Sequence, residues 1–258
     1  MTIATAPRST AGSGMARLIG VLGLVLAVAA LLLLAAGPVG WRAGWWSFRI
    51  AFTTLMPYAF YVGVAAIAIS VLALVTALGS IGRRGVVVAA CGLVIGGVAA
   101  YFPWHASEMR GVYPPMHDIT TDAVNPPSFD FATTMRAAEQ GAGVAYPGPD
   151  TYAMQQKFYP GIDPEMLAMP RAQAFDRALA AVKAKGWTIV KTDPAAGIID
   201  AYDKSFWFGF ADDVAIRVTP TDNGSRIDIR SGSRQGRGDF GVNAARVRGF
   251  LAALKAQP

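Results

Sequence analysis

Acidic residues are confined to one part of this chain. No Asp or Glu occurs before Glu108, and all 17 acidic residues lie between Glu108 and Asp239. From Trp104 onward, 17 basic residues balance them. The formal net charge of +6 comes wholly from Arg8, Arg17, Arg42, Arg49, Arg83 and Arg84. The sequence therefore predicts a membrane anchor followed by a near-neutral, water-facing domain, and the charge balance argues against nucleic acid as a partner.

Three uncharged, mostly aliphatic segments are long enough to be transmembrane helices: Leu18–Ala36, Met56–Leu78 and Gly85–Phe102. A helix rises about 1.5 Å per residue, so about 20 residues cross a hydrocarbon core of roughly 30 Å. The six arginines fall outside these segments, as expected from the high cost of a charge at the centre of a bilayer. The lipid bilayer is the first partner that the sequence predicts.

The arginines also predict an orientation. Placing residues 1–17 and the loop Gly79–Gly85 in the cytoplasm puts four arginines inside, as the positive-inside rule favours. Everything after Phe102 then lies outside. Cleavage of Leu18–Ala36 as a signal peptide is the alternative, although its apolar core is longer than the usual range of about 7–15 residues.

These patterns divide the chain into a flexible cytoplasmic tail (1–17), a three-helix transmembrane domain (18–103) and a water-facing domain (104–258) with a long proline-rich loop (124–170). The elements expected in the last domain are a strand at His117–Asp122, a helix at Arg171–Lys185, strands at Trp187–Lys191, Gly197–Phe206, Asp213–Thr219 and Arg226–Gly232, and a helix from about Phe240 to Lys255. This order predicts an α+β fold, with an antiparallel sheet of about four to five strands and helices packed on one face.

The hairpin between the last two strands has a predicted register. A two-residue loop at Asn223-Gly224 sets Val218 opposite Ile229 and Arg217 opposite Arg230. The apolar face of the hairpin then consists of Val214, Ile216, Val218, Ile227 and Ile229. The two arginines on the other face repel one another, and we expect Asp228 to offset that repulsion.

The densest polar segment leads into the final helix. We call its candidate ligand-binding residues the arginine ridge: Arg230, Ser233, Arg234, Arg237, Asn243 and Arg246. Free N–H groups and the positive end of the helix dipole favour an anion at such a place. The competing interpretation is that Asp239 caps the helix and pairs with a nearby arginine, which leaves no room for a ligand.

Two weaker patterns are also polar. Asp212 and Asp213 are adjacent carboxylates, and such a pair can serve as acid and base. Neighbouring residues of a strand point to opposite faces, however. The alternative is that they form a turn or that one of them pairs with Arg217. His117 with Asp118 and Asp122 is the second pattern. The sequence has no His or Cys cluster with zinc spacing and no nucleophile–base motif, so we expect no catalytic residue, no metal and no cofactor.

An aromatic run, Phe206-Trp207-Phe208-Gly209-Phe210, links two expected strands. In one interpretation two of its rings enter the core and the others cover the long loop. In the other, Phe206, Trp207, Phe208 and Phe210 form an apolar tip that enters the membrane or grips an apolar ligand. The sequence leaves both interpretations open.

Five segments resemble a known family: Pro115–Asp122, Tyr159–Ile162, Gly186–Val190, Phe208–Val214 and Ser233–Arg246. Through them, residues Pro114–Pro258 resemble the domain-of-unknown-function family 1499. The resemblance implies a bacterial or plastid protein, often attached to a membrane, and no established activity. The order of elements is also similar to that of helix-grip domains of outer-membrane-assembly lipoproteins, which is an analogy at the level of the fold.

The leading hypothesis is an inner-membrane protein with a periplasmic, non-catalytic binding or assembly module for the cell envelope. Its partners would be an envelope protein or an anionic envelope component. The first alternative is an envelope hydrolase or transferase, with Arg230, Arg234 and Arg237 holding an anionic substrate and Asp213 as the base. The second is a lipid-binding or lipid-handling domain that uses the aromatic tip.

Overall fold

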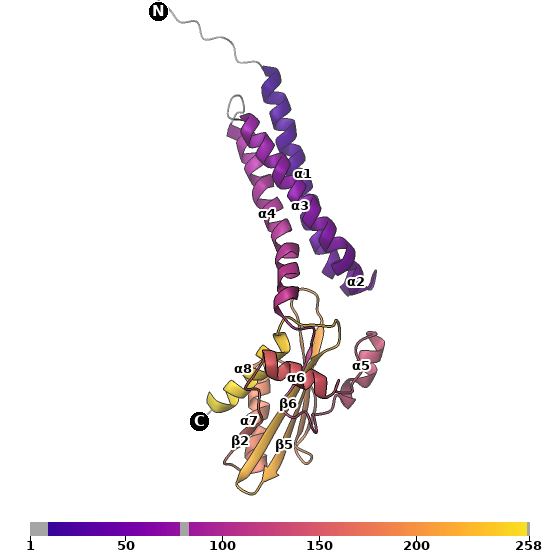
Figure 1. Cartoon of the computed structure of the whole chain (residues 1–258), viewed down its shortest axis with the longest axis vertical. Helices are drawn as coiled ribbons and strands as arrows, with labels where there is room; N and C mark the ends of the chain where they lie inside the picture. The colour runs from indigo at the N-terminus through magenta and orange to yellow at the C-terminus, as the bar shows by residue number, and fades with distance from the viewer. Residues whose placement is uncertain (1–9, 78–82, 257–258) are drawn as a thin grey trace, which may run out of the picture. The chain divides into compact units, whose positions relative to one another are not determined.

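A computed structural model describes residues 10–77 and 83–256 (Figure 1). The chain divides into two compact units, Met1–Met109 (unit 1) and Arg110–Pro258 (unit 2). Of the expected N-terminal tail, residues 1–9 lie outside the described residues, and helix α1 begins at Thr10. Residues 78–82, which are the last residue of the second expected span and most of the Gly79–Gly85 loop, also lie outside them.

Unit 1 consists of long apolar helices. They are α1 (Thr10–Arg42), the single turn α2 (Phe48–Ile50) that continues through η1 (Ala51–Leu55) into α3 (Met56–Ala77), and α4 (Arg83–Val112). Three stretches in them are long and apolar enough to cross a membrane: Arg17–Arg42, Phe48–Thr76 and Gly85–Val112. The three apolar helices expected from the sequence are therefore confirmed. Helix α4 continues ten residues beyond the expected end at Phe102, through Pro103.

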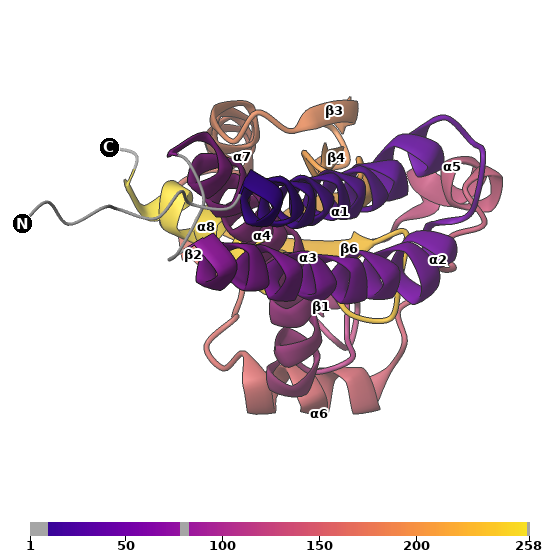
Figure 2. The ribbon, with the colours of Figure 1, turned by 90° about the horizontal axis from the view of Figure 1, so that it is seen from above.

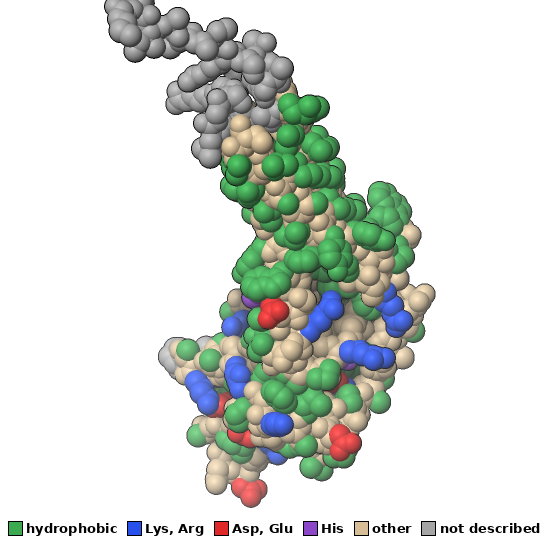
Figure 3. Space-filling view, turned by 45° about the horizontal axis from the view of Figure 1, so that its top comes forward, with side chains coloured by type: hydrophobic (Ala, Val, Ile, Leu, Met, Phe, Trp, Pro, Cys, Tyr) green, Lys and Arg blue, Asp and Glu red, His purple; other side chains and the backbone are tan. Residues whose placement is uncertain are grey.

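Small residues let the helices of unit 1 approach closely. A Cβ on Gly92 of α4 would crowd Ser70 of α3 and the backbone of α1 at Leu24. A Cβ on Gly96 would lie 3.1 Å from Ala66. Both glycines are therefore used for packing within the chain. On the face shown in Figure 3, the long helices present mostly hydrophobic side chains, as lipid-facing helices do.

Unit 2 is an α+β domain built on a six-stranded antiparallel sheet. Its strands are β1 (Asp118–Thr120), β2 (Glu165–Leu167), β3 (Thr188–Asp193), β4 (Ile198–Lys204), β5 (Ala211–Thr221) and β6 (Gly224–Ser233). Strands β3 to β6 form the expected meander, and β1 and β2 both pair with the free edge of β6, one at each end. The sheet therefore has one strand more than the upper end of the expected range.

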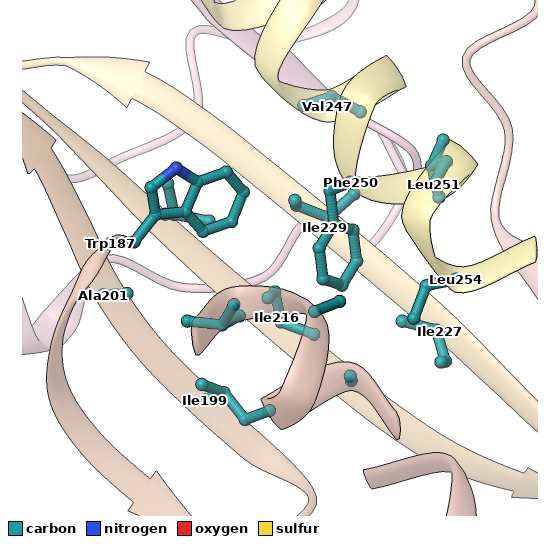
Figure 4. Close-up of a cluster of buried hydrophobic side chains, with 14 of the residues drawn as sticks. Trp187, Ile199, Ala201, Ile216, Ile227, Ile229, Val247, Phe250, Leu251 and Leu254 are labelled. Atoms are coloured by element: carbon teal, nitrogen blue, oxygen red, sulfur yellow. The ribbon is translucent and has the colours of Figure 1, made fainter. Parts of the chain in front are cut away.

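Helices α7 (Arg171–Ala184) and α8 (Val242–Ala256) cover one face of the sheet, here called the helix face. Apolar side chains of both helices and of the strands fill the space between, among them Trp187, Ile216, Ile229 and Phe250 (Figure 4). All five residues expected on the apolar face of the hairpin are buried there. The core face predicted from alternation is thus confirmed.

The opposite face of the sheet, here called the loop face, is covered by the chain between Val124 and Tyr146. This segment contains η2 (Asp130–Ala132) and α5 (Thr133–Ala138), and it packs Phe129 and Ala132 onto Ala215 of β5. Helices α8 and α5 accordingly lie on opposite sides of the strands in both ribbon views (Figures 1 and 2). The long helices share one face as expected, while shorter helical turns cover the other.

The proline-rich stretch 124–170 is not the aperiodic loop that we expected. It also contains α6 (Pro149–Phe158) and β2. Helix α6 is fixed to β1 by Gln155, whose side-chain amide donates to the carbonyl oxygen of Thr120 and accepts from its N–H, at 2.8 and 3.0 Å. Such short elements depend on tertiary contacts and therefore lack a periodic sequence pattern.

The register of the β5–β6 hairpin differs from the expected one by two residues. Thr221 pairs with Gly224, so the loop is Asp222-Asn223 and Gly224 lies in the strand with φ +148°. Arg217 consequently pairs with Asp228 rather than with Arg230, which turns an expected repulsion into an ion pair of 3.1 Å. A shift of two residues leaves the faces unchanged, which is why the core was still predicted correctly.

Candidate functional site

The sheet divides the arginine ridge between its two faces. Arg230 and Arg234 have their guanidinium groups on the loop face, where they meet Asp118 and Asp213. Ser233, Asn243 and Arg246 lie together on the helix face. Arg237 is exposed to solvent in the connection between β6 and α8. The ridge residues therefore do not line one continuous surface.

Arg230 is buried against a carboxylate and an aromatic ring. Its Nε and Nη2 donate to the two oxygens of Asp118 at 2.9 and 2.7 Å, and its guanidinium carbon lies 4.1 Å from the centre of the Phe129 ring. The carbonyl oxygens of Pro127 and Val144 accept two more of its hydrogen bonds. A bidentate pair with stacked aromatic cover is a strong internal contact, and it leaves this guanidinium no access to a ligand.

Asp213 holds two arginines from different elements. Arg234 donates to its Oδ1 at 2.7 Å, and Arg136 of α5 donates to its Oδ2 at 2.7 Å. Arg234 also pairs with Glu139 at 2.7 Å, just after α5. The Asp213 side chain is fully buried. This cluster fastens the cover of the loop face to the sheet, and sequence analysis missed its members Arg136 and Glu139 because nothing in their local pattern marks them.

The second cluster lies at the start of α8. Asn243 accepts from Ser231 Oγ at 2.6 Å and donates to Ser233 Oγ at 2.9 Å. Arg246 donates to Asn243 Oδ1, and it pairs with Asp212 at 2.8 Å and with Asp203 at 3.1 Å. Hydrogen bonds to most of the polar atoms in this cluster lock the helix onto the sheet.

Asp239 caps α8, as one of the two interpretations of the ridge required. Its two carboxylate oxygens accept from the N–H groups of Gly241 and Asn243, at 2.9 and 2.6 Å. Burial raises its pKa, and those two backbone hydrogen bonds counteract the rise. The helix begins at Val242 rather than at Phe240, because Phe240 and Gly241 both have positive φ. The Asp239 carboxylate thus already supplies the negative charge that the positive end of the α8 dipole favours.

The paired carboxylates point to opposite faces of the sheet, Asp212 toward Arg246 and Asp213 toward Arg136 and Arg234. Neither is the partner of Arg217. That arginine pairs instead with Asp122 and Asp228, at 2.9 and 3.1 Å.

His117 joins the second cluster through its backbone carbonyl group rather than through its imidazole ring. Its carbonyl oxygen accepts from Ser233 N and from Asn243 Nδ2. Within residues 10–77 and 83–256, no group of three or more His, Cys, Asp or Glu side chains is placed to hold a metal ion.

The aromatic tip is split between core and solvent. Phe208 is 9 % exposed and stacks on Phe210 with ring centres 4.9 Å apart. Phe206 and Trp207 are 90 % and 58 % exposed. Phe208 is therefore buried, as the first interpretation expected of two rings, while Phe206 and Trp207 face solvent. Their contact with a membrane or an apolar ligand stays a prediction.

An open hollow of about 210 Å³ lies beside the second cluster. Its lining is Lys185, Trp187, Asp203, Val242, Ala245, Arg246 and Gly249. Gly249 lies inside α8, where glycine is unfavourable, and the amine of Lys185 occupies the space next to it. Charges of both signs, from Lys185, Arg246 and Asp203, line the hollow.

A family model matches the C-terminal part of the chain. Residues 118–254, more than half of the chain, match the family described as "Protein of unknown function (DUF1499)". The chain belongs to the DUF1499 family. No curated protein matches it. The DUF1499 region begins at Asp118 and ends within α8, so it contains both clusters and the aromatic tip and leaves out the three apolar helices. The family named from the sequence motifs is thereby confirmed.

Proposed function

We propose that this DUF1499 protein is an inner-membrane protein whose unit 2 is a periplasmic, non-catalytic binding or assembly module of the cell envelope. The observation that carries the proposal is that the carboxylate and guanidinium groups which could act on a substrate are buried in ion pairs inside the fold. Asp213 is buried between Arg136 and Arg234, and Arg230 is buried against Asp118. What remains accessible is surface for recognition: the hollow beside α8, Arg237, Phe206 and Trp207.

The enzymatic alternative requires Asp213 to take a proton from a substrate. Both of its oxygens accept hydrogen bonds from guanidinium groups, and its side chain has no exposed surface. A general base must come within hydrogen-bond reach of the proton that it removes. Because this geometry gives Asp213 no access to a substrate, it favours a binding module over a hydrolase or transferase.

The periplasmic side is supported by the arginine distribution. Arg8, Arg17, Arg83 and Arg84 flank the ends that we place in the cytoplasm, and the first connection carries two arginines. A cysteine test addresses this directly: Asn223→Cys, in the exposed β5–β6 turn, is combined with Cys91→Ala. An impermeant maleimide should label it in intact spheroplasts. Labelling only after lysis would place unit 2 in the cytoplasm and overturn the location.

The binding role is tested with a photo-crosslinking amino acid at position 237 in the full chain, expressed in its native membrane. We expect a discrete cross-linked envelope protein or anionic polymer that is absent when the crosslinker is at position 223 in the distant turn. Arg237→Ala should weaken recovery of the same component while leaving the thermal unfolding of the chain unchanged, because this side chain is exposed. Identical products from both positions would contradict a binding surface near α8.

A further inference from the structure

The exposed half of the aromatic tip is held in a fixed turn. Gly209 N donates to Ser205 O at 2.8 Å, and Ser205 N donates to Phe210 O at 2.9 Å. The Ser205 hydroxyl oxygen accepts from Phe210 N at 3.0 Å, and Phe208 anchors the turn in the interior. The fold thus presents Phe206 and Trp207 to the outside from a rigid base, although folding normally withdraws large apolar rings from water.

The sheet register places this tip at the end of the sheet where the chain enters from α4. Gly232 of β6 pairs with both Asp118 of β1 and Asp213 of β5, and Lys204 pairs with Ala211 across the tip. Between the end of α4 at Val112 and Asp118, six peptide steps span at most about 20 Å. Adjacent strands are about 4.8 Å apart, so β4 lies only about 15 Å across the sheet from β1.

Three exposed cations lie at this end of the sheet. Lys185, Lys204 and Arg237 are exposed, and none of them forms an ion pair with another described residue. Most acidic residues at the same end have polar partners: Asp203 and Asp212 share Arg246, Glu139 pairs with Arg234, and Asp239 accepts two backbone N–H groups. A basic fringe around exposed aromatic rings matches the headgroup layer of an anionic membrane.

From the rigid tip, its position at the entry end and the basic fringe, we propose that Phe206 and Trp207 insert into the headgroup layer of the bilayer that the apolar helices cross. Unit 2 then has two membrane attachments, the chain from α4 and the tip. The covalent connection to α4 makes insertion of the tip an intramolecular event at a high effective concentration. The apolar contact of only two rings can therefore hold the tip at the membrane. This inference does not depend on which partner unit 2 binds.

The test uses the full chain reconstituted in vesicles of phosphatidylcholine and phosphatidylglycerol. Trp207→Cys in the Cys91→Ala background carries an environment-sensitive fluorophore, and lipids with a doxyl quencher report contact with the bilayer. The matched control carries the same label at Asn223→Cys, an exposed turn at the opposite end of the sheet. We expect quenching at position 207 to exceed that at position 223 about threefold or more, with a blue-shifted emission, because interfacial aromatic positions lie at headgroup depth.

Two further variants sharpen the result. Phe206→Ser should reduce the quenching at position 207, and Lys204→Gln should make it less sensitive to the phosphatidylglycerol fraction. Equal quenching at positions 207 and 223 would overturn the proposal. A blue-shifted label at position 207 that lipid quenchers do not reach would also overturn it, since the tip would then be covered by protein.

Discussion

At the level of single residues, the Asp118–Arg230 pair shows that Arg230, one member of the arginine ridge, is held inside the fold. Both side chains are almost fully buried, and the guanidinium is covered by the Phe129 ring. Arg230→Ala leaves the Asp118 carboxylate buried without a partner, so we expect it to destabilise unit 2 by about 3–5 kcal/mol. Thermal unfolding of the full chain in detergent measures this. Arg237→Ala is the control, because removal of an exposed side chain should cost at most about 0.5 kcal/mol. Similar losses for both variants would refute the structural role.

Asp200 predicts a pH dependence of stability. Burial raises the pKa of its carboxyl group to about 6; Lys191 lowers this pKa and Asp130 adds to the rise. Because the folded pKa exceeds the unfolded value of about 3.9, the folded state binds the proton more tightly. The resulting stability is fully present below pH ~4 and is lost as the pH rises through about 6.

Asp200→Asn should therefore stabilise the chain at pH 8 by about 1–3 kcal/mol and change little at pH 4, because the amide replaces a carboxyl group that is already neutral there. Unfolding temperatures of the two proteins, measured across this range, should diverge as the pH rises. Parallel curves would show that Asp200 is not the group responsible.

At the scale of elements, glycines fix the β5–β6 hairpin and its neighbour β2. Gly224 has φ +148°, and a Cβ on it would overlap the carbonyl oxygen of Leu167. Gly161 also has positive φ, +72°, but a Cβ there meets nothing within 4 Å. Gly161→Ala should cost about 1–2 kcal/mol from the backbone alone. Gly224→Ala should cost clearly more, since β2 must also move, and the difference in unfolding temperature between the two variants isolates that contact.

The same elements show how far the sequence predicts this fold. Periodicity and alternation locate α7, α8 and the meander because those patterns follow from burying one face of each element. They do not locate β2 or α6, which are held by contacts with residues distant in sequence, such as Gln155 with Thr120. The dipeptide Asn223-Gly224 suggested a loop that the approach of β2 to Gly224 shifts by one position.

The candidate site was less predictable than the fold, for a related reason. The sequence identifies Arg230, Arg234 and Arg246 as a polar cluster, but their partners Asp118, Asp213 and Asp203 lie between 21 and 112 residues away. Whether an arginine faces solvent or a buried carboxylate depends on these distant pairings. Exposure of Phe206 and Trp207 likewise depends on which ring of the run enters the interior; that ring is Phe208, which stacks on Phe210.

At the scale of the whole molecule, acidic residues are distributed unevenly along the chain. Unit 1 has a single acidic residue, Glu108, near its end, while unit 2 pairs most of its buried charges internally. Apolar helices without acids can reside in a bilayer, and a domain with balanced charges can remain in water beside it. We propose that the principal task of the arginines in unit 1 is to set the orientation of the chain.

That task leads to a prediction about topology. Arg83→Gln with Arg84→Gln removes two of the four arginines that we place in the cytoplasm, so the remaining charges, Arg8 and Arg17 against Arg42 and Arg49, no longer favour one side. We expect a mixed population, with maleimide labelling of Asn223→Cys in intact spheroplasts falling to about half of that in the parent chain. Replacing Arg237 and Arg248 by Gln removes the same charge from unit 2, far along the chain from the spans, and should leave labelling unchanged. Full labelling of both variants would mean that the loop arginines do not set the orientation and that another feature of the spans does.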